Sequence, residues 1–324
     1  MSTSTMERAP VETRRHEKHD RLIAAAQALP TLTVAVVHPC DGASLGAALE
    51  AAGLGLVEPI LVGPRAKIGA AAVALGADIA AFRLVDAAHS HEAAEKAVAL
   101  VRAGEAEALM KGSLHTDELM AAVVRRDGGL RTARRLSHCF VMDVPGHATP
   151  LIVTDAAINI APSLEEKRDI TQNAIDLARA LGVETVRVAI LSAMETVNAK
   201  VPSTLDAAAL CKMADRDQIT GAVLDGPLAL DNAIDLGAAL IKKIRSPVAG
   251  QANVLVVPDL EAGNVLAKSL TFLADADAAG IVLGARVPII LTSRADARLT
   301  RLASCAVASL VAAAARAGRS LPEV

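Results

Sequence analysis

Aromatic side chains are nearly absent from the 324-residue sequence, which has three Phe and neither Trp nor Tyr. Hydrophobic residues still make up 52% of the chain, so its core must be built from Val, Leu, Ile and Ala. Without aromatic rings there are no platforms on which single-stranded nucleic acid could stack its bases. An excess of one charge is also lacking, because 33 basic and 36 acidic residues leave a net charge of −3. We therefore expect neither nucleic acid nor a membrane as a partner, and any anion site must come from local geometry.

Cysteine is scarce, and its spacing excludes two classes of protein. Cys40, Cys139, Cys211 and Cys305 are far apart and form no CxxC pair, which fits neither a zinc site nor a disulfide scaffold and suits a reducing cytosol. The first 21 residues mix both charge signs, unlike a secretory signal. No uninterrupted apolar run reaches the roughly 18 to 20 residues of a membrane span. We expect a soluble cytoplasmic protein without a metal.

Short apolar runs alternate with Ala-rich helical patterns along most of the chain. TVAVVH (33–38), EPILVG (58–63) and EALMKG (107–112) each precede a helical segment. This alternation is typical of βαβ units with a parallel sheet, and strands that are apolar throughout fit a sheet covered on both faces. Because the chain is longer than one typical domain, we predict an α/β fold with two Rossmann-like domains.

The rhythm changes at residues 137–162, where CFVMDV and PLIVTD are separated by Pro-Gly-His. This pattern predicts a hairpin, whose antiparallel strands would join the two α/β domains. We predict a polar tail at 1–20, a first domain at 21–149 and a second domain at 150–296. The C-terminal helix, 297–324, is expected to return to the first domain.

Ligands of such sheets bind beyond the carboxyl ends of the strands, so the strand ends are the candidate sites. MKGSLHT (110–116) places Lys111 and Gly112 at a strand end, with His115 and Thr116 in the first helical turn. Gly lets the backbone approach a ligand closely, and the free amides of a helix start favour an anion. The alternative is an ordinary turn in which Thr116 caps the helix and Lys111 is solvated.

LTSRAD (291–296) ends the last predicted strand with Ser293, Arg294 and Asp296. The hydroxyl and the carboxylate could simply cap the next helix. An Arg beside a helix N-terminus is disfavoured by the helix dipole, so a bound anion explains Arg294 better.

VVPDLEAGN (256–264) places Asp259, Glu261, Gly263 and Asn264 within six residues of another strand end. We expect Gly263 to permit close approach, Asn264 to cap the helix or contact substrate, and the two carboxylates to position basic groups. Other polar residues carry weaker signals. The carboxylates Asp225, Asp231 and Asp235 are interpreted as loop residues, and the lone histidines His138 and His147 as structural or exposed.

Six stretches in series resemble the phosphate acetyltransferase and phosphate butyryltransferase family. Each is weak alone, but all lie at strand ends or adjoining turns, and together they span about 107 to 296. The stretches are EALMKGSLHTDEL, GGLRTARRLSH, TDAAINIAPS, LDGPLALDNAI, QANVLVVPDLEAGNVLAKSL and VPIILTSRAD.

The resemblance implies an isocitrate dehydrogenase-like fold of two α/β domains with a cleft between them, in a homodimer. It implies reversible transfer of a short acyl group between coenzyme A (CoA) and inorganic phosphate, with CoA as a substrate, no tightly bound cofactor and no metal in the chemical step. It also implies substrate contacts at Lys111, Gly112, His115, Thr116, Arg131, Asn159, Asp259, Glu261, Gly263 and Asn264.

The same resemblance implies catalytic roles after the last strand. Ser293 would hydrogen-bond the thiol or the oxyanion, and Arg294 would bind phosphate with its two-pronged guanidinium. Acetyl relatives carry an Asp seven residues past that Ser as the base for the thiol, where this chain has Thr300. Asp296, three residues past Ser293, is the nearest replacement.

A second departure concerns an arginine that acetyl relatives have after the Lys-Gly segment. Residues 120–124 contain none, so Arg131, Arg134 or Arg135 is expected to make the second anion contact. Two other functions stay open: a non-catalytic acyl-CoA or acyl-phosphate binding protein, and a metal- and NAD(P)-dependent decarboxylating dehydrogenase. The dehydrogenase is disfavoured because no GxGxxG fingerprint is evident. The preferred acyl chain length cannot be read from the sequence, since one methylene changes discrimination only about 10- to 200-fold.

Overall fold

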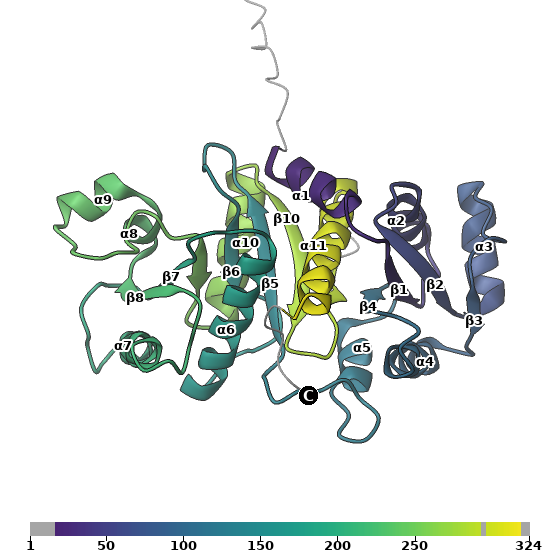
Figure 1. The fold of residues 1–324 in the computed structure, drawn as a ribbon, viewed down its shortest axis with the longest axis horizontal. Coiled ribbons are helices and arrows are strands. Elements are labelled where there is room, and N and C mark those ends of the chain that lie inside the picture. Colours follow the sequence, from purple (N-terminus) through teal and green to yellow (C-terminus); the bar gives the residue numbers. More distant parts are fainter. Residues whose placement is uncertain (1–16, 293–295, 319–324) are drawn as a thin grey trace, which may run out of the picture.

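The computed structural model describes residues 17–292 and 296–318 as one α/β protein built on a large central sheet (Figure 1). The sheet has eleven strands in the order β3-β2-β1-β4-β11-β10-β5-β6-β9-β7-β8. The strands are β1 Leu32–Val37, β2 Val57–Gly63, β3 Leu84–Asp86, β4 Ala108–Lys111, β5 Ser137–Asp143, β6 Leu151–Thr154, β7 Arg187–Leu191, β8 Val223–Leu228, β9 Val254–Val256, β10 Asp277–Leu283 and β11 Ile289–Ile290.

Helices connect most of these strands. They are α1 Glu17–Gln27, α2 Gly42–Gly53, α3 Arg65–Leu75, α4 Ser90–Arg102, α5 Thr116–Val123, α6 Leu164–Ala180, α7 Pro202–Ala214, α8 Leu230–Ile234, α9 Leu236–Ile241, α10 Leu260–Leu273 and α11 Arg298–Arg316. The predicted βα alternation is therefore confirmed. It follows from apolar strand runs bounded by polar and glycine-containing turns.

The sheet contains two parallel groups of strands that run in opposite directions. One group is β3-β2-β1-β4-β11, and the other is β6-β9-β7-β8. Between them, the pairs β11–β10, β10–β5 and β5–β6 are each antiparallel. Three reversals leave the second group pointing opposite to the first. The carboxyl ends of the two groups therefore lie at opposite edges of the sheet.

The hairpin predicted around Pro-Gly-His is confirmed. It consists of β5 and β6, which pair antiparallel from Cys139 opposite Thr154 to Met142 opposite Leu151. Alternate side chains of β5 face opposite sides of the sheet: Cys139 and Val141 join one core, whereas Met142 joins another.

One face of the sheet is covered continuously, and the other in two parts. On the first face, buried residues of α1, α2, α3, α6, α7 and α11 form one core that spans both strand groups. On the second face, one core lies under α4 and α5, and a separate core lies under α8, α9 and α10. On this second face the division falls over the middle of β5 and β10, whereas the core on the first face continues across these strands. The division of the chain into domains at residue 150 stays a prediction.

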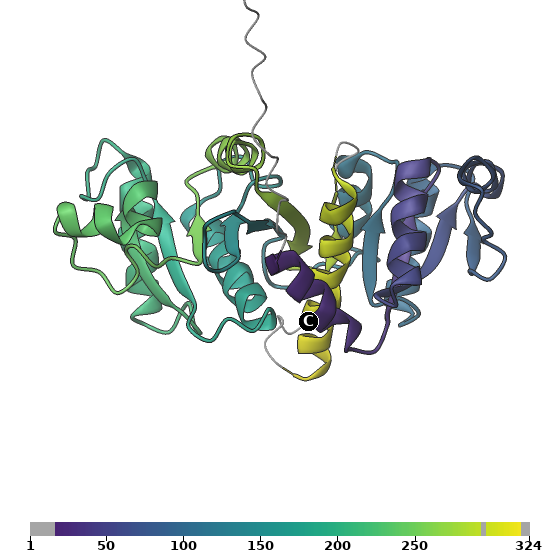
Figure 2. The ribbon, with the colours of Figure 1, turned by 90° about the horizontal axis from the view of Figure 1, so that it is seen from above.

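The C-terminal helix α11 is 19 residues long and apolar enough to cross a membrane by length and composition, but 67% of that stretch is buried inside the protein. It lies beside α1 at the centre of the molecule and packs on β10 (Figures 1 and 2). This burial is typical of a core helix. The packing also brings the far ends of the chain together, since α1 is the first described helix.

Candidate functional site

The carboxyl end of β4 packs directly on the end of β1, and only glycine fits there. A Cβ on Gly112 would lie 2.3 Å from the carbonyl oxygen of Val37 and 2.6 Å from that of His38. The Gly112 amide instead donates to Val37 O at 2.9 Å. The glycine predicted to permit close approach thus lets one strand end approach another.

A polar loop follows β1 at the same place. His38 has a positive φ of 56°, and its carbonyl oxygen accepts hydrogen bonds from Cys40 N, Ser113 N and Ser113 Oγ at 2.9, 3.0 and 2.7 Å. Its ring Nδ1 lies 3.0 Å from Ser113 Oγ. These bonds hold the loop after β1 against the loop after β4.

A small cavity of about 20 Å³ lies where the ends of β4 and β11 meet the start of α2. Its lining includes Asp41, Ser44, Lys111, Thr292 and Arg301. Lys111 is 8% exposed, so the alternative in which this lysine is simply solvated is wrong. The two cationic side chains favour an anion, whereas the Asp41 carboxylate, which already caps α2, opposes one. A cavity of this size admits about one water-sized group.

The Ser-Arg pair predicted to be catalytic, Ser293 and Arg294, lies outside the described residues. Its neighbours on both sides are described. Thr292 lines the small cavity, and Asp296 is half-buried just before α11. The register Ile290 opposite Met110 brings the MKG and TSRAD strand ends together at one edge of the sheet, as the sequence pattern predicts.

The remaining residues predicted at this edge open α5. His115 is exposed and occupies the N-cap position without a side-chain cap, and Thr116 is the first residue of the helix. The alternative in which Thr116 caps the helix is therefore wrong. The first-turn amides of α5 receive no cap from His115, which leaves them available to water or to a ligand.

The residues of VVPDLEAGN fasten α10 to the loop after β6. Asp259 Oδ1 caps the helix by accepting from Ala262 N at 2.8 Å, and Asn264 Nδ2 donates to Ala156 O at 3.2 Å. A Cβ on Gly263 would lie 2.6 Å from the carbonyl oxygen of Asp155. Gly263 and Asn264 therefore pack against the loop, whereas Glu261 is exposed. The alternative in which Asn264 caps the helix is wrong, because Asp259 is the N-cap of α10.

Asn159 lies in that loop and is only 2% exposed. Its Nδ2 donates to Leu136 O at 2.8 Å and to Asp155 Oδ2 at 2.5 Å, while its Oδ1 accepts from Arg135 Nε at 2.7 Å. All its polar atoms are thus used inside the protein. The amide orients Arg135, which also pairs with Glu166 at 3.1 Å.

A larger cavity of about 510 Å³ lies beside this network. Apolar side chains from three elements contribute to its walls, namely Met120, Leu136 and Ile158, and four arginines line it: Arg131, Arg134, Arg135 and Arg168. Three of them have carboxylate partners, since Arg134 pairs with Asp176, Arg135 with Glu166 and Arg168 with Asp169. Arg131 makes no ion pair with any described residue and is exposed. Its guanidinium is therefore the one best placed to bind an incoming anion.

The predicted site residues thus form two groups. Lys111, Gly112, His115, Thr116 and Asp296 lie where β4 and β11 end. The other group lies at the opposite edge, where β6 and β9 end and β5 begins: Arg131, Asn159, Asp259, Glu261, Gly263 and Asn264. Periodicity along a single chain does not reveal this separation, because it depends on the order and direction of the strands.

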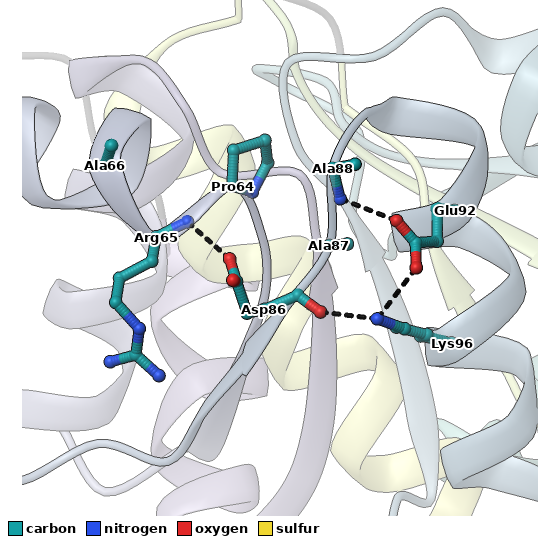
Figure 3. Close-up of a pocket in the computed structure, with 8 residues that line it drawn as sticks. All are labelled: Pro64, Arg65, Ala66, Asp86, Ala87, Ala88, Glu92 and Lys96. Carbon is teal, nitrogen blue, oxygen red and sulfur yellow. Dashed lines mark hydrogen bonds and ion pairs between the residues drawn. The ribbon is translucent and has the colours of Figure 1, made fainter.

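A third cavity, of about 620 Å³, lies beyond the ends of β2 and β3 (Figure 3). Its polar groups bond to each other: Asp86 Oδ1 accepts from Arg65 N at 2.9 Å, and Lys96 Nζ donates to Asp86 O at 2.7 Å. Glu92 accepts from Ala88 N and pairs with Lys96. The carboxylate of Asp86 already accepts from the N-terminal amide of α3, as Asp41 does at the start of α2, and the only lysine that lines this cavity, Lys96, pairs with Glu92.

The three aspartates interpreted as loop residues also have local partners. Asp225 Oδ1 accepts from Gly226 N, Asp235 Oδ1 accepts from Ala238 N, and Asp231 pairs with Lys242 at 3.2 Å. Within the described ranges, no group of three or more His, Cys, Asp or Glu side chains is placed to hold a metal. The interpretation of all three as loop residues is wrong, because Asp225 lies in β8 and Asp231 in the first turn of α8, whereas Asp235 lies between α8 and α9 as the N-cap of α9.

The protein's own thiols are poor nucleophiles. Burial raises the pKa of Cys139 and of Cys305 to about 12, and that of Cys40 to about 11. At neutral pH these groups are therefore protonated. A substrate thiol with an ordinary pKa forms a thiolate at neutral pH more readily than these cysteines do.

Sequence reasoning does not identify four residues that lie at the edge where β4 and β11 end. They are His38, Asp41, Ser113 and Arg301. The signal for two of them is present, since HPCD directly follows the first apolar run, at the kind of strand end where ligands bind. Arg301 carries no such signal, because only the packing of α11 brings it to the cavity.

Comparison with known proteins adds a direct indication of function. A family model described as Phosphate acetyl/butaryl transferase matches residues 89–309. A phosphate acetyltransferase from Rhizobium meliloti is 66% identical over 302 residues, covering 93% of this chain and 96% of the relative. A phosphate butyryltransferase from Clostridium acetobutylicum is 42% identical over 279 residues, covering 86% and 93%.

Solved structures agree with the fold. The crystal structure of a branched-chain phosphotransacylase from Enterococcus faecalis superposes with a TM-score of 0.76 at 29% sequence identity, covering 87% of this chain and 99% of that one. The matched length includes both parallel strand groups. The arrangement of the central sheet is therefore shared with a protein that carries that name.

Proposed function

This chain belongs to the Phosphate acetyl/butaryl transferase family, and we propose that it transfers a short acyl group reversibly between CoA and inorganic phosphate at the edge where β4 and β11 end. The observation that carries the location is the cavity lined by Lys111 and Arg301 next to Thr292. Lys111 and Arg301 place positive charge beside this cavity, which is itself too small for a phosphate ion, and the Ser-Arg pair follows Thr292 in the next two positions of the chain.

The chemistry requires a thiolate, a polarised carbonyl and a held phosphate. The CoA sulfur attacks the carbonyl carbon of the acyl phosphate, the carbon–oxygen bond to phosphate breaks, and phosphate leaves with the electron pair. In the reverse direction a phosphate oxygen attacks the thioester carbon and the carbon–sulfur bond breaks. We assign phosphate binding to Arg294 and stabilisation of the oxyanion to Ser293, in the same loop as Asp296.

We propose that CoA extends from this edge of the sheet to the other. Leu291, just after β11, lies beside Gly280 of β10, because its amide donates to Gly280 O. Gly280 in turn pairs with Phe140 of β5, which is four residues after Leu136 in the lining of the 510 Å³ cavity. Four residues of a strand span roughly 14 Å. We place the acyl and thiol groups near Lys111 and the nucleotide end of CoA in the 510 Å³ cavity, where the apolar walls suit the base and Arg131 suits a phosphate. In this arrangement the residues of α10 hold the loop after β6 in place and do not contact phosphate.

We also propose an assembly and a location for the chain, each supported by one further feature. α10 presents Val265, Phe272 and Leu273 to solvent, 64%, 81% and 86% exposed, and we propose that this face pairs with a second copy of the chain. Sedimentation of the wild type against Phe272→Asp tests this, because a polar substitution at the centre of the interface should leave a monomer. All four cysteines are free thiols, which fits a cytoplasmic location. The two-domain, Rossmann-like and dehydrogenase-like description of the fold belongs with these proposals.

The deciding assay measures free thiol released from acetyl-CoA and from butyryl-CoA, with and without phosphate. We expect phosphate-dependent release and a higher kcat/KM for acetyl-CoA, because the 66% identical relative is a phosphate acetyltransferase. Tight CoA binding without turnover of either substrate would instead support a non-catalytic binding protein and refute the proposed activity.

A further inference from the structure

His38 has a backbone conformation that glycine would adopt at lower cost, which suggests that its side chain has a role. Its φ of 56° lies in the left-handed region, which favours glycine and costs a side-chain-bearing residue about 1 kcal/mol or more. The surrounding contacts hold it there, since its amide donates to Val62 O at 2.7 Å and its carbonyl accepts three hydrogen bonds. Three other non-glycine residues, Asp217, Lys243 and Asp275, also have a positive φ, but only His38 lies at the edge where β4 and β11 end.

The contacts of Ser113 select one tautomer of the His38 ring. Ser113 Oγ has a single hydrogen, and its shortest contact, 2.7 Å, is to His38 O, which can only accept. With the hydroxyl hydrogen directed at His38 O, the 3.0 Å contact between Ser113 Oγ and His38 Nδ1 is satisfied when Nδ1–H is the donor. In the neutral ring the proton is thus on Nδ1, and Nε2 carries the lone pair.

Three charged groups act on this ring. Burial and the nearby Lys67 lower the pKa of His38, while the carboxylates of Glu118 and Asp41 oppose that shift. Lys67 belongs to α3, Glu118 to α5, and Asp41 caps α2. The net effect keeps the imidazole neutral at pH 7, and the side chain is only partly buried. A neutral imidazole nitrogen with a lone pair is a competent proton acceptor.

Position 300 cannot play that role. Thr300 has a hydroxyl, which accepts no proton at neutral pH, and its carbonyl is used by Ser304 Oγ at 2.7 Å. We propose that His38 is the base of this enzyme: its Nε2 accepts the proton of the CoA thiol, and Ser113 is the positioning residue that holds the required tautomer. This inference rests on the proposed acyl transfer.

The proton balance closes in both directions. The S–H proton moves to Nε2, and the resulting thiolate forms the new bond to the acyl carbon as phosphate departs. The imidazolium formed returns the proton to the CoA thiolate when the reaction runs from acyl-CoA and phosphate. The lone pair and proton remain within the site, and no oxidant or metal is required.

The test uses the full-length chain in the phosphate-dependent thiol-release assay, measured from pH 5 to 9. His38→Asn tolerates a positive φ and keeps a polar side chain but has no basic nitrogen. We expect its kcat to fall 10²- to 10⁴-fold with a small change in KM. The acidic limb of the wild-type kcat profile, with an apparent pKa below 6.5, should disappear. Ser113→Ala should retain the limb with reduced kcat, and exposed His147→Asn should behave as wild type.

His38→Gly provides a second, independent readout, because glycine suits this φ and leaves space for added imidazole. Partial recovery of kcat with imidazole supports the base role, since a structural role would not respond. The inference is overturned if His38→Asn keeps wild-type kcat and pH profile, if imidazole restores nothing, or if the acidic limb persists in His38→Asn and vanishes in Asp296→Asn. If the wild type releases no thiol with phosphate, the proposed function itself fails, and the inference with it.

Discussion

Asp143, the last residue of β5, anchors the N-terminal end of α1 through Lys18. The ammonium of Lys18 lies 2.7 Å from Asp143 Oδ1, and the amides of Lys18 and His19 both donate to Oδ2. The two side chains are 10% and 3% exposed. Burial acts to raise the pKa of Asp143, but the bonds from Lys18 and His19 outweigh it and hold that pKa below its usual value.

Removing this charge should be costly. We expect Asp143→Asn to lower the free energy of unfolding by roughly 3–5 kcal/mol at pH 7, because it leaves a buried ammonium without its partner. Urea denaturation measures the change. The exposed pair Glu95–Arg125 supplies the control, and Glu95→Gln should cost less than about 1 kcal/mol. Equal effects of the two variants would show that the buried pair contributes no more than a surface pair.

Gly112 should tolerate no side chain. In Gly112→Ala the new Cβ would meet two backbone oxygens closer than 3 Å, and backbone atoms cannot move aside without separating β4 from β1. We expect the free energy of unfolding to fall by at least roughly 1–3 kcal/mol. Enzyme activity should fall as well, because the substitution displaces the strand end that carries Lys111. Gly69→Ala is the matched control: no atom lies within 4 Å of its Cβ, and in the interior of α3 alanine should stabilise by roughly 0.5–1 kcal/mol.

Arg131→Ala tests whether the 510 Å³ cavity binds the nucleotide end of CoA. If the guanidinium binds a phosphate of CoA, the KM for CoA should rise about 10- to 100-fold, the effect of one charged hydrogen bond, with little change in kcat. The KM for a pantetheine thioester, which lacks the nucleotide, should not change. Arg125→Ala, whose side chain pairs with Glu95 on the surface, should match wild type for both substrates. A parallel rise for both substrates would place Arg131 outside the nucleotide subsite.

Arg294→Ala tests the phosphate role. We expect the KM for phosphate to rise at least about 10-fold or kcat to fall by a similar factor, because a charge-assisted contact to the anion is lost. The melting temperature should stay close to wild type. Wild-type kinetics for this variant would remove Arg294 from the site.

His138 should make stability depend on pH. Burial lowers its pKa to about 4, from roughly 6.5 in the unfolded chain, although nearby Asp155 opposes the shift. Between pH 4 and pH 6.5 the unfolded state binds more protons than the folded state. The stability that the neutral His138 contributes is therefore fully present above pH 6.5 and is lost as pH falls toward 4. The loss should be on the order of 3 kcal/mol. Urea titrations at pH 5 and 7 should show a smaller difference for His138→Gln than for wild type, whereas His147→Gln should keep the wild-type difference.

The local elements were readable because each follows from neighbouring residues. The apolar run TVAVVH became β1, and Pro-Gly-His became the turn between β5 and β6. The KGSLHT turn was predicted, but the burial of Lys111 was not, because burial depends on Thr292 and Arg301, which are distant in sequence. The sequence pattern predicts His38 only as the end of a strand. Its positive φ and its contact with Ser113 arise from the packing of β1 beside β4, which the local pattern does not contain.

By itself, the sequence determined the α/β class, the hairpin at the centre and the strand ends that carry polar residues, since these depend on short-range pattern and turn chemistry. Only the tertiary structure decided which strand ends share an edge. Three antiparallel pairings at β10 and β5 turn the second strand group around, so Lys111 and Asp259 end at opposite edges of one sheet. Strand direction is set by long-range pairing and core packing, and a local pattern of residues carries no record of it.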